Sequence, residues 1–302
     1  MLAGCLCGIR NAADIRSLQR NPPAKSGFPS GSPGRLPTET EKKVLKPVSN
    51  DYGDLSQDIL TRRAADGRIV ALLPVGAFEN HGPHLPLGTD HIIADELSLR
   101  VAASLEEAVI RLPGIWLGVS GEHVSDDMAP QATLSIEAGT LIDQIDGIAA
   151  GLVRAGIRHL LLLNGHGGNI AALNIAILNV RRKHGVLAAN AHWLDFGLPD
   201  DLDAPTEARA DVHGGWLETA LMLAIRPELV RLDKATANPA TEGGSLLFPA
   251  GPVQWGWKTD DLATGGWVGR PDLATPETGQ QLLTHALKHF QLLTTEMAAR
   301  KL

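Results

Sequence analysis

Two short runs of almost uninterrupted apolar residues constrain the fold of this chain most strongly. Residues 68–75 read RIVALLPV, and residues 157–163 read IRHLLLL. A strand that is apolar on both faces is typical of a parallel sheet covered by helices on both sides. We therefore expect both runs to be central strands of such a sheet.

Segments with apolar residues at helical spacing alternate with these strands. Helices are expected over residues 92–109, 141–156, 170–184 and 215–225, and a last helix begins at Thr275-Pro276. Gly185 is expected to end the third of them. Further strands are expected over residues 113–120, 132–136 and 186–193. The alternation predicts βαβ units, and hence an α/β fold with a mainly parallel sheet.

The N-terminal sixth of the chain differs from the rest in composition. Residues 1–50 are rich in Pro, Gly, Ser, Lys and Arg and show little apolar periodicity. Such a segment buries too little apolar surface to offset the entropy lost on ordering. We expect a disordered extension over residues 1–50 and a single domain over residues 51–302.

Composition also narrows the class of protein. A hydrophobic share of 44% and a charged share of 20% are typical of a soluble globular chain. The net charge of -7, with acids and bases interspersed, gives no electrostatic footprint for nucleic acid. No apolar run reaches the length of a membrane span. The two cysteines, Cys5 and Cys7, are compatible with a reducing cytoplasm, where we expect the protein to act.

The loop after the first strand carries side chains that bind metals. Residues 75–91 read VGAFENHGPHLPLGTDH and include Glu79, His81 and Asp90. Carboxylate oxygens with imidazole nitrogens suit zinc, manganese or iron. An extended backbone aims residues 79 and 81 the same way, and Asp90 could bridge two cations. The alternative is a polar surface loop with solvated histidines.

A second turn, NGHGGN over residues 164–169, follows the second central strand. His166 is its candidate ligand. The alternative is a phosphate-binding glycine turn, but this one holds no Lys or Arg and lacks the GxGxxG spacing. Both turns leave the carboxyl edge of a parallel sheet, where ligand sites form, so they are expected to meet there.

A third segment, VHGGWLET over residues 212–219, places His213 at the start of a helix expected near Gly214. His213 is a candidate acid or base because its unperturbed pKa lies near neutrality. Glu218, about one turn into the helix, is a candidate ligand and a candidate catalytic proton relay, and the alternative is an exposed helical glutamate.

Other candidates are weaker. His84 and His91 could orient ligands through hydrogen bonds, and Glu122-His123 could line the mouth of the site. Tryptophans in the long loop over residues 233–274 either cover a pocket or pack in the interior: Trp255, Trp257 and Trp267. Four histidines are expected to be structural: His159, His184, His285 and His289.

Taken together, the motifs over residues 74–90, 164–169 and 213–219 resemble the three signatures of the creatininase (creatinine amidohydrolase) family. The segment GGWVGRPDLATPETG, residues 265–279, is similar to the C-terminal part of that family, so the resemblance covers residues 69–302. It implies a three-layer α/β/α sandwich, assembly as a homohexamer, and a dinuclear metal site at the strand ends.

The resemblance also implies a role for each matched residue. Glu79 and His166 would hold one metal and His81 the other, with Asp90 bridging. His213 matches the histidine that moves protons, and Glu218 matches the acid one turn further on.

The middle motif departs from creatininase proper, where it reads NGHYEN and its glutamate binds the second metal. Gly167 and Gly168 stand in place of the tyrosine and that glutamate. Glu218 is expected to substitute as the ligand, and the alternative is that the second metal binds weakly. MAPQATLSI, residues 128–136, replaces the phenylalanine-proline-glycine-threonine segment usual in the family. Creatinine is therefore not the expected substrate.

These observations predict a metal-dependent amidohydrolase that cleaves a non-peptide or cyclic amide C–N bond of a small molecule by metal-activated hydroxide. Two divalent ions per chain are expected, Zn²⁺ or Mn²⁺, with Fe²⁺ as a third choice. The alternatives on the same site are a mycofactocin-type peptidase, a formamide deformylase and hydrolysis of a sugar-derived ring. A non-catalytic metal- or small-molecule-binding protein is the rival from another class.

Overall fold

The structure is a computed structural model, and it describes residues 49–106, 108–125, 132–207, 211–240, 246–249 and 253–301. The chain divides into two units, Met1–Ser49 and Asn50–Leu302, and the second contains the fold described below. The extension expected over residues 1–50 therefore lies almost entirely outside the described residues.

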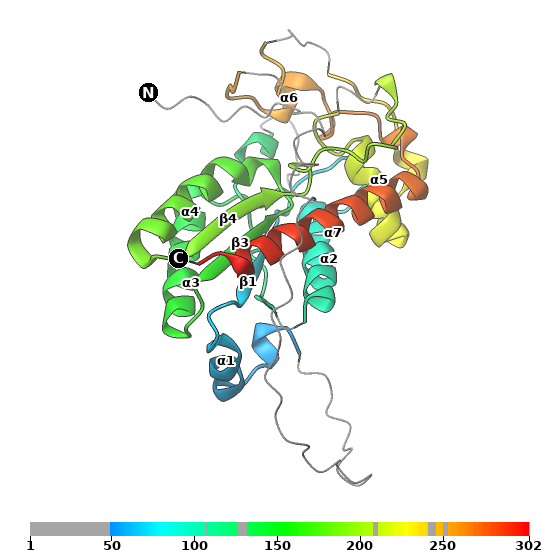
Figure 1. Cartoon of the computed structure of the whole chain (residues 1–302). Helices are drawn as coiled ribbons and strands as arrows, with labels where there is room; N and C mark the ends of the chain where they lie inside the picture. Colours follow the sequence, from blue (N-terminus) through cyan, green and yellow to red (C-terminus); the bar gives the residue numbers. More distant parts are fainter. Residues whose placement is uncertain are drawn as a thin grey trace, which may run out of the picture. The chain divides into compact units, whose positions relative to one another are not determined.

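The unit is built on a four-stranded sheet in the order β2-β1-β3-β4. The strands are β1 (Val70–Val75), β2 (Val109–Arg111), β3 (His159–Asn164) and β4 (Leu187–His192), and every pairing is parallel. All residues of β1 and β3 are buried. The two apolar runs are the central strands, as predicted (Figure 1).

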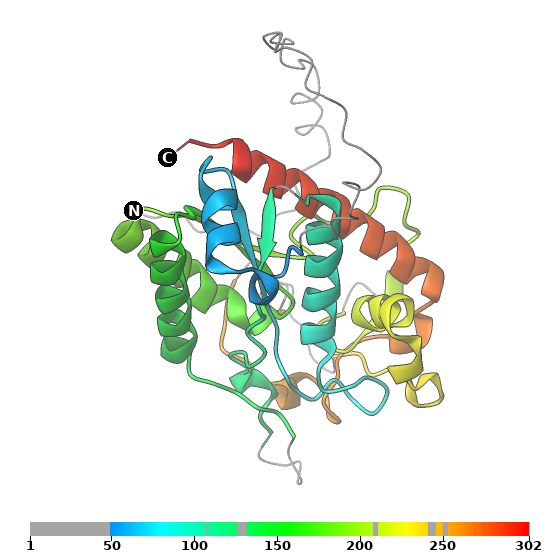
Figure 2. The same ribbon diagram turned by 90° about the horizontal axis from the view of Figure 1, so that it is seen from below.

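Helices cover both faces of the sheet (Figures 1 and 2). One face packs against α1 (Gln57–Ala64), α3 (Ala138–Arg154) and α4 (Ile170–His184). The other packs against α2 (Thr89–Ser104), α5 (Trp216–Ile225) and α7 (Pro276–Ala299). This arrangement confirms the three-layer α/β/α sandwich.

Alternation along β3 divides the core between the two faces. Leu160 and Leu162 pack with α3 and α4, whereas Leu161 and Leu163 pack with α2, α5 and α7. Successive side chains of a strand point to opposite faces, so a fully apolar strand contributes to both cores. Burial of each leucine side chain contributes about 1.5–3 kcal/mol.

The short elements complete the connections. α6 spans Thr259–Leu262. The 3-10 helices are η3 (Tyr52–Asp54), η4 (Gly121–His123), η5 (Gly167–Asn169), η7 (Pro227–Leu229), η8 (Leu232–Lys234) and η9 (Pro271–Leu273). Among the described residues, no helix has both the length and the apolar character that crossing a membrane requires.

Several predicted boundaries are correct. α4 ends at His184 and is capped by Gly185, whose φ of 67° places it in the left-handed region that favours glycine. α7 begins at Pro276, and the Thr275 hydroxyl accepts the backbone N–H of Thr278 at 3.1 Å.

Other boundaries were wrong. The helix expected over residues 92–109 ends at Ser104, because Val109 pairs with Val70 as the first residue of β2. Residues 113–120 and 132–136 form isolated bridges rather than strands. β1 ends at Val75, so the first of these segments pairs with it only at Ile115. Part of the departing MAPQATLSI segment, residues 128–131, lies outside the described residues.

Candidate metal centre

The two predicted turns meet at the carboxyl edge of the sheet. Val75, the last residue of β1, pairs with Asn164, the last residue of β3. The N–H of Gly165 then donates to the Val75 carbonyl oxygen at 2.8 Å. The loop that carries Glu79 and the turn that carries His166 therefore begin side by side, as expected for a parallel sheet.

Glu79 lies at the centre of the cluster and is fully buried. Its Oε1 atom is 3.3 Å from Nε2 of His123 and 3.3 Å from Nδ1 of His166. The same oxygen is 3.7 Å from Nδ1 of His213 and 3.9 Å from Nε2 of His81. One carboxylate thus faces four imidazole rings.

Asp90, in the first turn of α2, connects two of these histidines. Its Oδ1 atom is 3.2 Å from Nε2 of His81, and its Oδ2 atom is 3.3 Å from Nδ1 of His166. The two oxygens of one carboxylate therefore face two different imidazoles. This is the arrangement expected of a residue that bridges two ions.

Glu218 approaches His81 from the other side. Its Oε2 atom accepts the backbone N–H of Gly214 at 2.6 Å, and its Oε1 atom lies 3.9 Å from Nε2 of His81. α5 begins at Trp216 rather than near Gly214, and Glu218 lies in its first turn. One oxygen is held by the backbone, so the other is oriented toward the cluster.

The histidines share a bonding pattern that suits metal ligation. Nδ1 of His81 bonds the Glu79 carbonyl oxygen at 3.1 Å, and Nε2 of His166 bonds the Val119 carbonyl oxygen at 3.0 Å. A carbonyl only accepts, so these nitrogens carry protons and the opposite nitrogen offers its lone pair when the ring is neutral. In both rings that opposite nitrogen faces Asp90. A second hydrogen bond of this kind orients most metal-binding histidines.

The residues present fit a divalent metal. Both carboxylate oxygens of Glu79 and Oδ2 of Asp90 are buried with no hydrogen-bond partner among the described residues. Buried carboxylates are costly unless a cation accompanies them, either a protonated histidine or a metal ion. Three groups of donor atoms lie close enough together to hold an ion: Glu79, His123 and His166; Glu79, His81 and His213; His81, Asp90 and Glu218.

Burial and mutual charge shift the proton affinities of the cluster. Burial raises the pKa of Glu79 to about 8 and that of Glu218 to about 7. Burial alone would lower the pKa of His81 and His166, but it is outweighed by the neighbouring carboxylates, and both values rise to about 10. Without a metal, the cluster therefore retains protons that a bound ion would displace.

His213 lies against the cluster, and its imidazole ring is neutral. Its Nε2 atom donates to the Asn80 carbonyl oxygen at 2.7 Å, which leaves the lone pair on Nδ1. Its ring stacks on the ring of His123 with the centroids 3.8 Å apart, and its centroid lies 4.2 Å from that of the His81 ring. Burial, together with the charge of His81, holds the pKa of His213 well below its usual range.

His123 lies deeper in the cluster than the sequence predicted. It was expected only to line the mouth, but it is buried against Glu79. Its position after the apolar segment over residues 113–120 was the only available clue. Of the other two weak candidates, only His84 lies next to the cluster. It bonds the Gly214 carbonyl oxygen at 2.8 Å, beside His213. His91 packs instead against Phe78 and Trp116.

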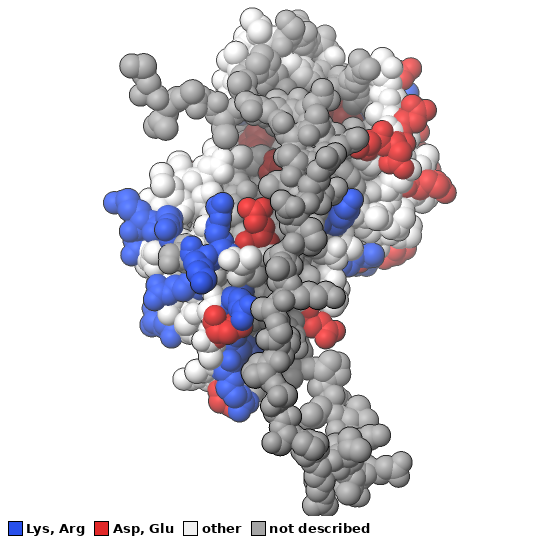
Figure 3. All heavy atoms as spheres, in the orientation of Figure 1, with Lys and Arg blue, Asp and Glu red and all other residues white. Residues whose placement is uncertain are grey.

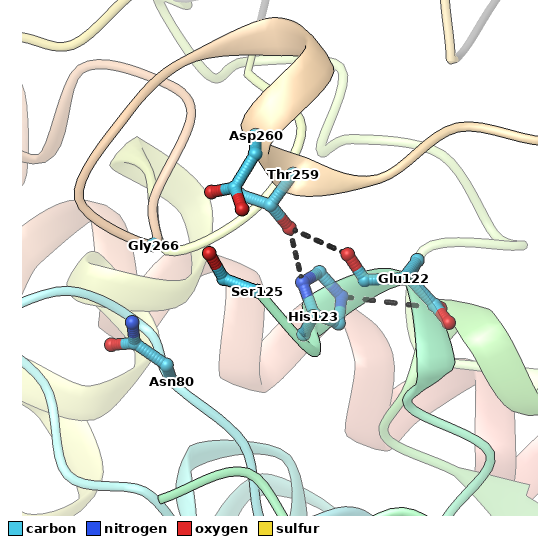
Figure 4. Close-up of a pocket in the computed structure, with 7 residues that line it drawn as sticks. All are labelled: Asn80, Glu122, His123, Ser125, Thr259, Asp260 and Gly266. Carbon is cyan, nitrogen blue, oxygen red and sulfur yellow. Dashed lines mark hydrogen bonds and ion pairs between the residues drawn. The ribbon is translucent and has the colours of Figure 1, made fainter. Parts of the chain in front are cut away.

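A small pocket opens above the cluster. Figure 4 shows the residues that line it: Asn80, Glu122, His123, Ser125, Thr259, Asp260 and Gly266. The rings of Trp257 and His123 meet edge-on with their centroids 6.1 Å apart, so this tryptophan helps to cover the site. Trp267 packs against His84, and Trp255 packs against a minor apolar cluster with Leu262.

Among the residues that the structure describes, no lysine or arginine lines this pocket. On the face shown in Figure 3, basic side chains gather over the part of the unit that holds α3 and α4. The last turn of α4 alone carries three of them, Arg181, Arg182 and Lys183. Cations at a helix C-terminus stabilise the helix dipole, so these residues have a structural explanation away from the pocket.

An α/β sandwich with a cluster of histidines and carboxylates at its strand ends is an arrangement that metal-dependent hydrolases use. The chain belongs to the creatininase family, because the family model described as creatinine amidohydrolase matches residues 55–293.

Relatives and solved structures agree with this assignment. The chain is 31% identical over 217 residues to the creatinine amidohydrolase of Pseudomonas putida, covering 67% of this chain and 82% of that protein. It is 33% identical over 218 residues to the mycofactocin precursor peptide peptidase of Mycobacterium ulcerans (strain Agy99), covering 70% of this chain and 78% of that protein. The solved Zn–Zn form of a mutant creatininase superposes with a TM-score of 0.66 at 25% identity, covering 83% of this chain and 99% of that structure.

Proposed function

We propose that this protein is a metal-dependent amidohydrolase that cleaves a non-peptide or cyclic amide C–N bond in a small molecule. The observation that carries the proposal is the position of Asp90 between two half-sites. Its Oδ2 atom faces His166, which also faces Glu79, and its Oδ1 atom faces His81, which also faces Glu218.

The donor atoms divide naturally between two ions. Glu79 and His166 would hold one ion, His81 and Glu218 the other, and Asp90 both. Mixed nitrogen and oxygen donors suit Zn²⁺ or Mn²⁺, with Fe²⁺ as a third choice. When bound, such ions supply Lewis acidity that lowers the pKa of water and polarises a carbonyl oxygen.

Within this arrangement the side chains have distinct tasks. His213 is neutral and its Nδ1 lone pair faces the cluster, so it takes a proton from the attacking water and returns it to the leaving nitrogen. One water is consumed, and an acid and an amine are formed. Glu218 accepts the Gly214 N–H just before α5 with one oxygen, and its other oxygen would bind metal.

A second candidate function is peptide trimming on the same site, and the 33% identity to a mycofactocin precursor peptide peptidase favours it. Formamide removal and opening of a sugar-derived ring use the same chemistry. A non-catalytic binding protein is less well supported, since all six predicted residues are present and lie together. We propose a homohexamer that acts in the cytoplasm, from the family resemblance and the low cysteine content.

His166→Ala tests the proposal directly. The variant is expected to lose turnover and at least one metal, because His166 faces both Glu79 and Asp90. Turnover is measured on a panel of lactams, linear amides, formamides and short peptides, with metal content measured on the same samples. His184→Ala is the matched control, since His184 pairs with Asp146 on the surface. Full activity in the His166 variant would refute the account.

A further inference from the structure

His123 has the geometry of a ligand although the sequence placed it at the mouth. The turn η4, Gly121–His123, carries its ring to within 3.3 Å of Glu79 Oε1, measured from Nε2. The same carboxylate oxygen is 3.3 Å from Nδ1 of His166. His123 is buried, and with Glu79 and His166 it forms a group of three donors close enough to hold one ion.

Thr259, from the distant helix α6, determines which nitrogen of His123 offers its lone pair. The Thr259 hydroxyl donates its single proton to the Glu122 carbonyl oxygen at 3.2 Å. Both contacts are hydrogen bonds at the same time only if the Thr259 oxygen accepts the 2.7 Å hydrogen bond from Nδ1 of His123. The proton of the neutral ring is then on Nδ1, and the lone pair on Nε2 points toward Glu79. Figure 4 shows Thr259 above the His123 ring with both contacts drawn.

The absence of a side chain at position 168 leaves room for this turn. A Cβ atom added to Gly168 would lie 2.0 Å from Oε1 of Glu122 and 2.5 Å from the Val119 carbonyl oxygen. Real Cβ atoms do not approach other heavy atoms so closely. The segment that leads into His123 therefore packs directly against the backbone of the NGHGGN turn.

We propose that His123 binds metal through Nε2, beside Glu79 and His166, and that Thr259 is the positioning residue that fixes its tautomer. This inference rests on the proposed function, which requires the cluster to bind divalent metal. It extends that function by adding a ligand from the segment between β2 and α3 and a support from α6.

Cobalt(II) binding to the metal-free full-length chain tests the ligand assignment. His123→Ala is compared with wild type by chelator competition, which gives affinity, and by the visible spectrum of the bound ion, which reports its ligand set. Weaker binding together with an altered spectrum is expected. His184→Ala, a histidine outside the cluster, is expected to match wild type in both.

Thr259 is tested by a pair of variants. Thr259→Val keeps the shape but removes the acceptor, and we expect cobalt binding to weaken by about 10–100-fold, as for other supports of metal ligands. Thr259→Ser restores the hydroxyl and is expected to restore wild-type affinity and spectrum. Thr264→Val, at an exposed threonine nearby, is the control. If His123→Ala does not fold, this pair still tests whether the Thr259 hydroxyl positions His123 for metal binding.

The outcomes separate the two proposals. A wild-type chain that binds no cobalt, zinc or manganese would overturn the proposed function and this inference together. Wild-type binding with an unchanged spectrum and affinity in His123→Ala would overturn only the assignment of His123. Equal binding by Thr259→Val and Thr259→Ser would overturn the positioning role of Thr259.

Discussion

Glu79 shows how single residues define this site. Its carboxylate is fully buried, faces four histidines and has no hydrogen-bond partner among the described residues. A residue in that position destabilises the fold unless it is protonated or accompanied by a cation. The raised pKa of Glu79, about 8, reflects this burial in the metal-free state. Its position is therefore better explained by metal binding than by packing.

At the same scale, Gly168→Ala is expected to destabilise the protein by about 1–3 kcal/mol, the usual cost of overpacking. The new Cβ would displace the Val119 backbone and Glu122, and with them the turn that carries His123. Metal affinity should fall as well. Thermal unfolding and cobalt titration measure the two effects.

Gly167→Ala provides a matched control for that variant. A Cβ atom added at Gly167 meets no other atom within 4 Å, although the two glycines are adjacent in η5. Its stability and metal affinity should equal those of wild type. Equal behaviour of the two variants would show that Gly168 has no special role.

The sequence was sufficient to select six residues that the structure brings together: Glu79, His81, Asp90, His166, His213 and Glu218. Each lies next to a strand end or a helix start, where local pattern predicts position. Their individual roles stay predictions. His123 could not be selected in this way, because its place depends on a 3-10 turn and on a hydroxyl 136 residues away.

Among the elements, α5 depends on one buried carboxylate. Asp211 accepts the backbone N–H groups of Trp216 at 2.8 Å and Leu217 at 3.1 Å, the first residues of that helix. It also accepts the N–H of Arg270 at 3.2 Å, from the segment that pairs with His213 through Val268. Asp211 therefore fixes the helix that carries Glu218 and the segment that holds His213.

Asp211→Ala is expected to lower stability by about 1–3 kcal/mol, because three partly buried N–H groups lose their acceptor. Metal affinity should fall with it, since Glu218 is oriented by the same helix. Urea unfolding and metal titration test this. Asp203→Ala, at an exposed aspartate in the preceding loop, should change neither. A stable Asp211 variant with normal metal binding would contradict this role.

Element prediction succeeded where the pattern was long and local. α3, α4, α5 and α7 follow apolar residues at helical spacing, and β1, β3 and β4 follow short apolar runs. It failed between residues 105 and 136, where the described residues form one short strand and several single bridges. Those pairings are set by where β1 ends, which is tertiary information that a local pattern does not contain.

At the scale of the whole folded unit, the cluster couples stability to pH. The folded pKa of Glu79, about 8, lies above its ordinary value of 4.5, and the pKa values of His81 and His166, about 10, lie above their ordinary value of 6.5. Between the ordinary and the raised pKa values of these groups, the folded metal-free chain therefore holds more protons than the unfolded chain. Its stability should fall as pH rises from about 6.5 to about 10.

Metal binding displaces these protons, so it should stabilise the protein more strongly at higher pH. We expect the increase in Tm on adding zinc or manganese to be larger at pH 8 than at pH 6. Thermal unfolding with and without the ion, in buffers that do not bind metal, measures this. A larger increase at pH 6 would contradict the proton linkage.

The number of metal ions bound per chain tests the central claim most directly. It is measured by elemental analysis of the full-length protein, purified without a metal-binding tag and then supplied with zinc or manganese. The account predicts about two ions per wild-type chain and the loss of one in Glu218→Ala, because Glu218 and His81 form one half-site. A wild-type chain that holds only one ion would contradict the dinuclear site, and a chain that holds none would contradict metal-dependent hydrolysis altogether.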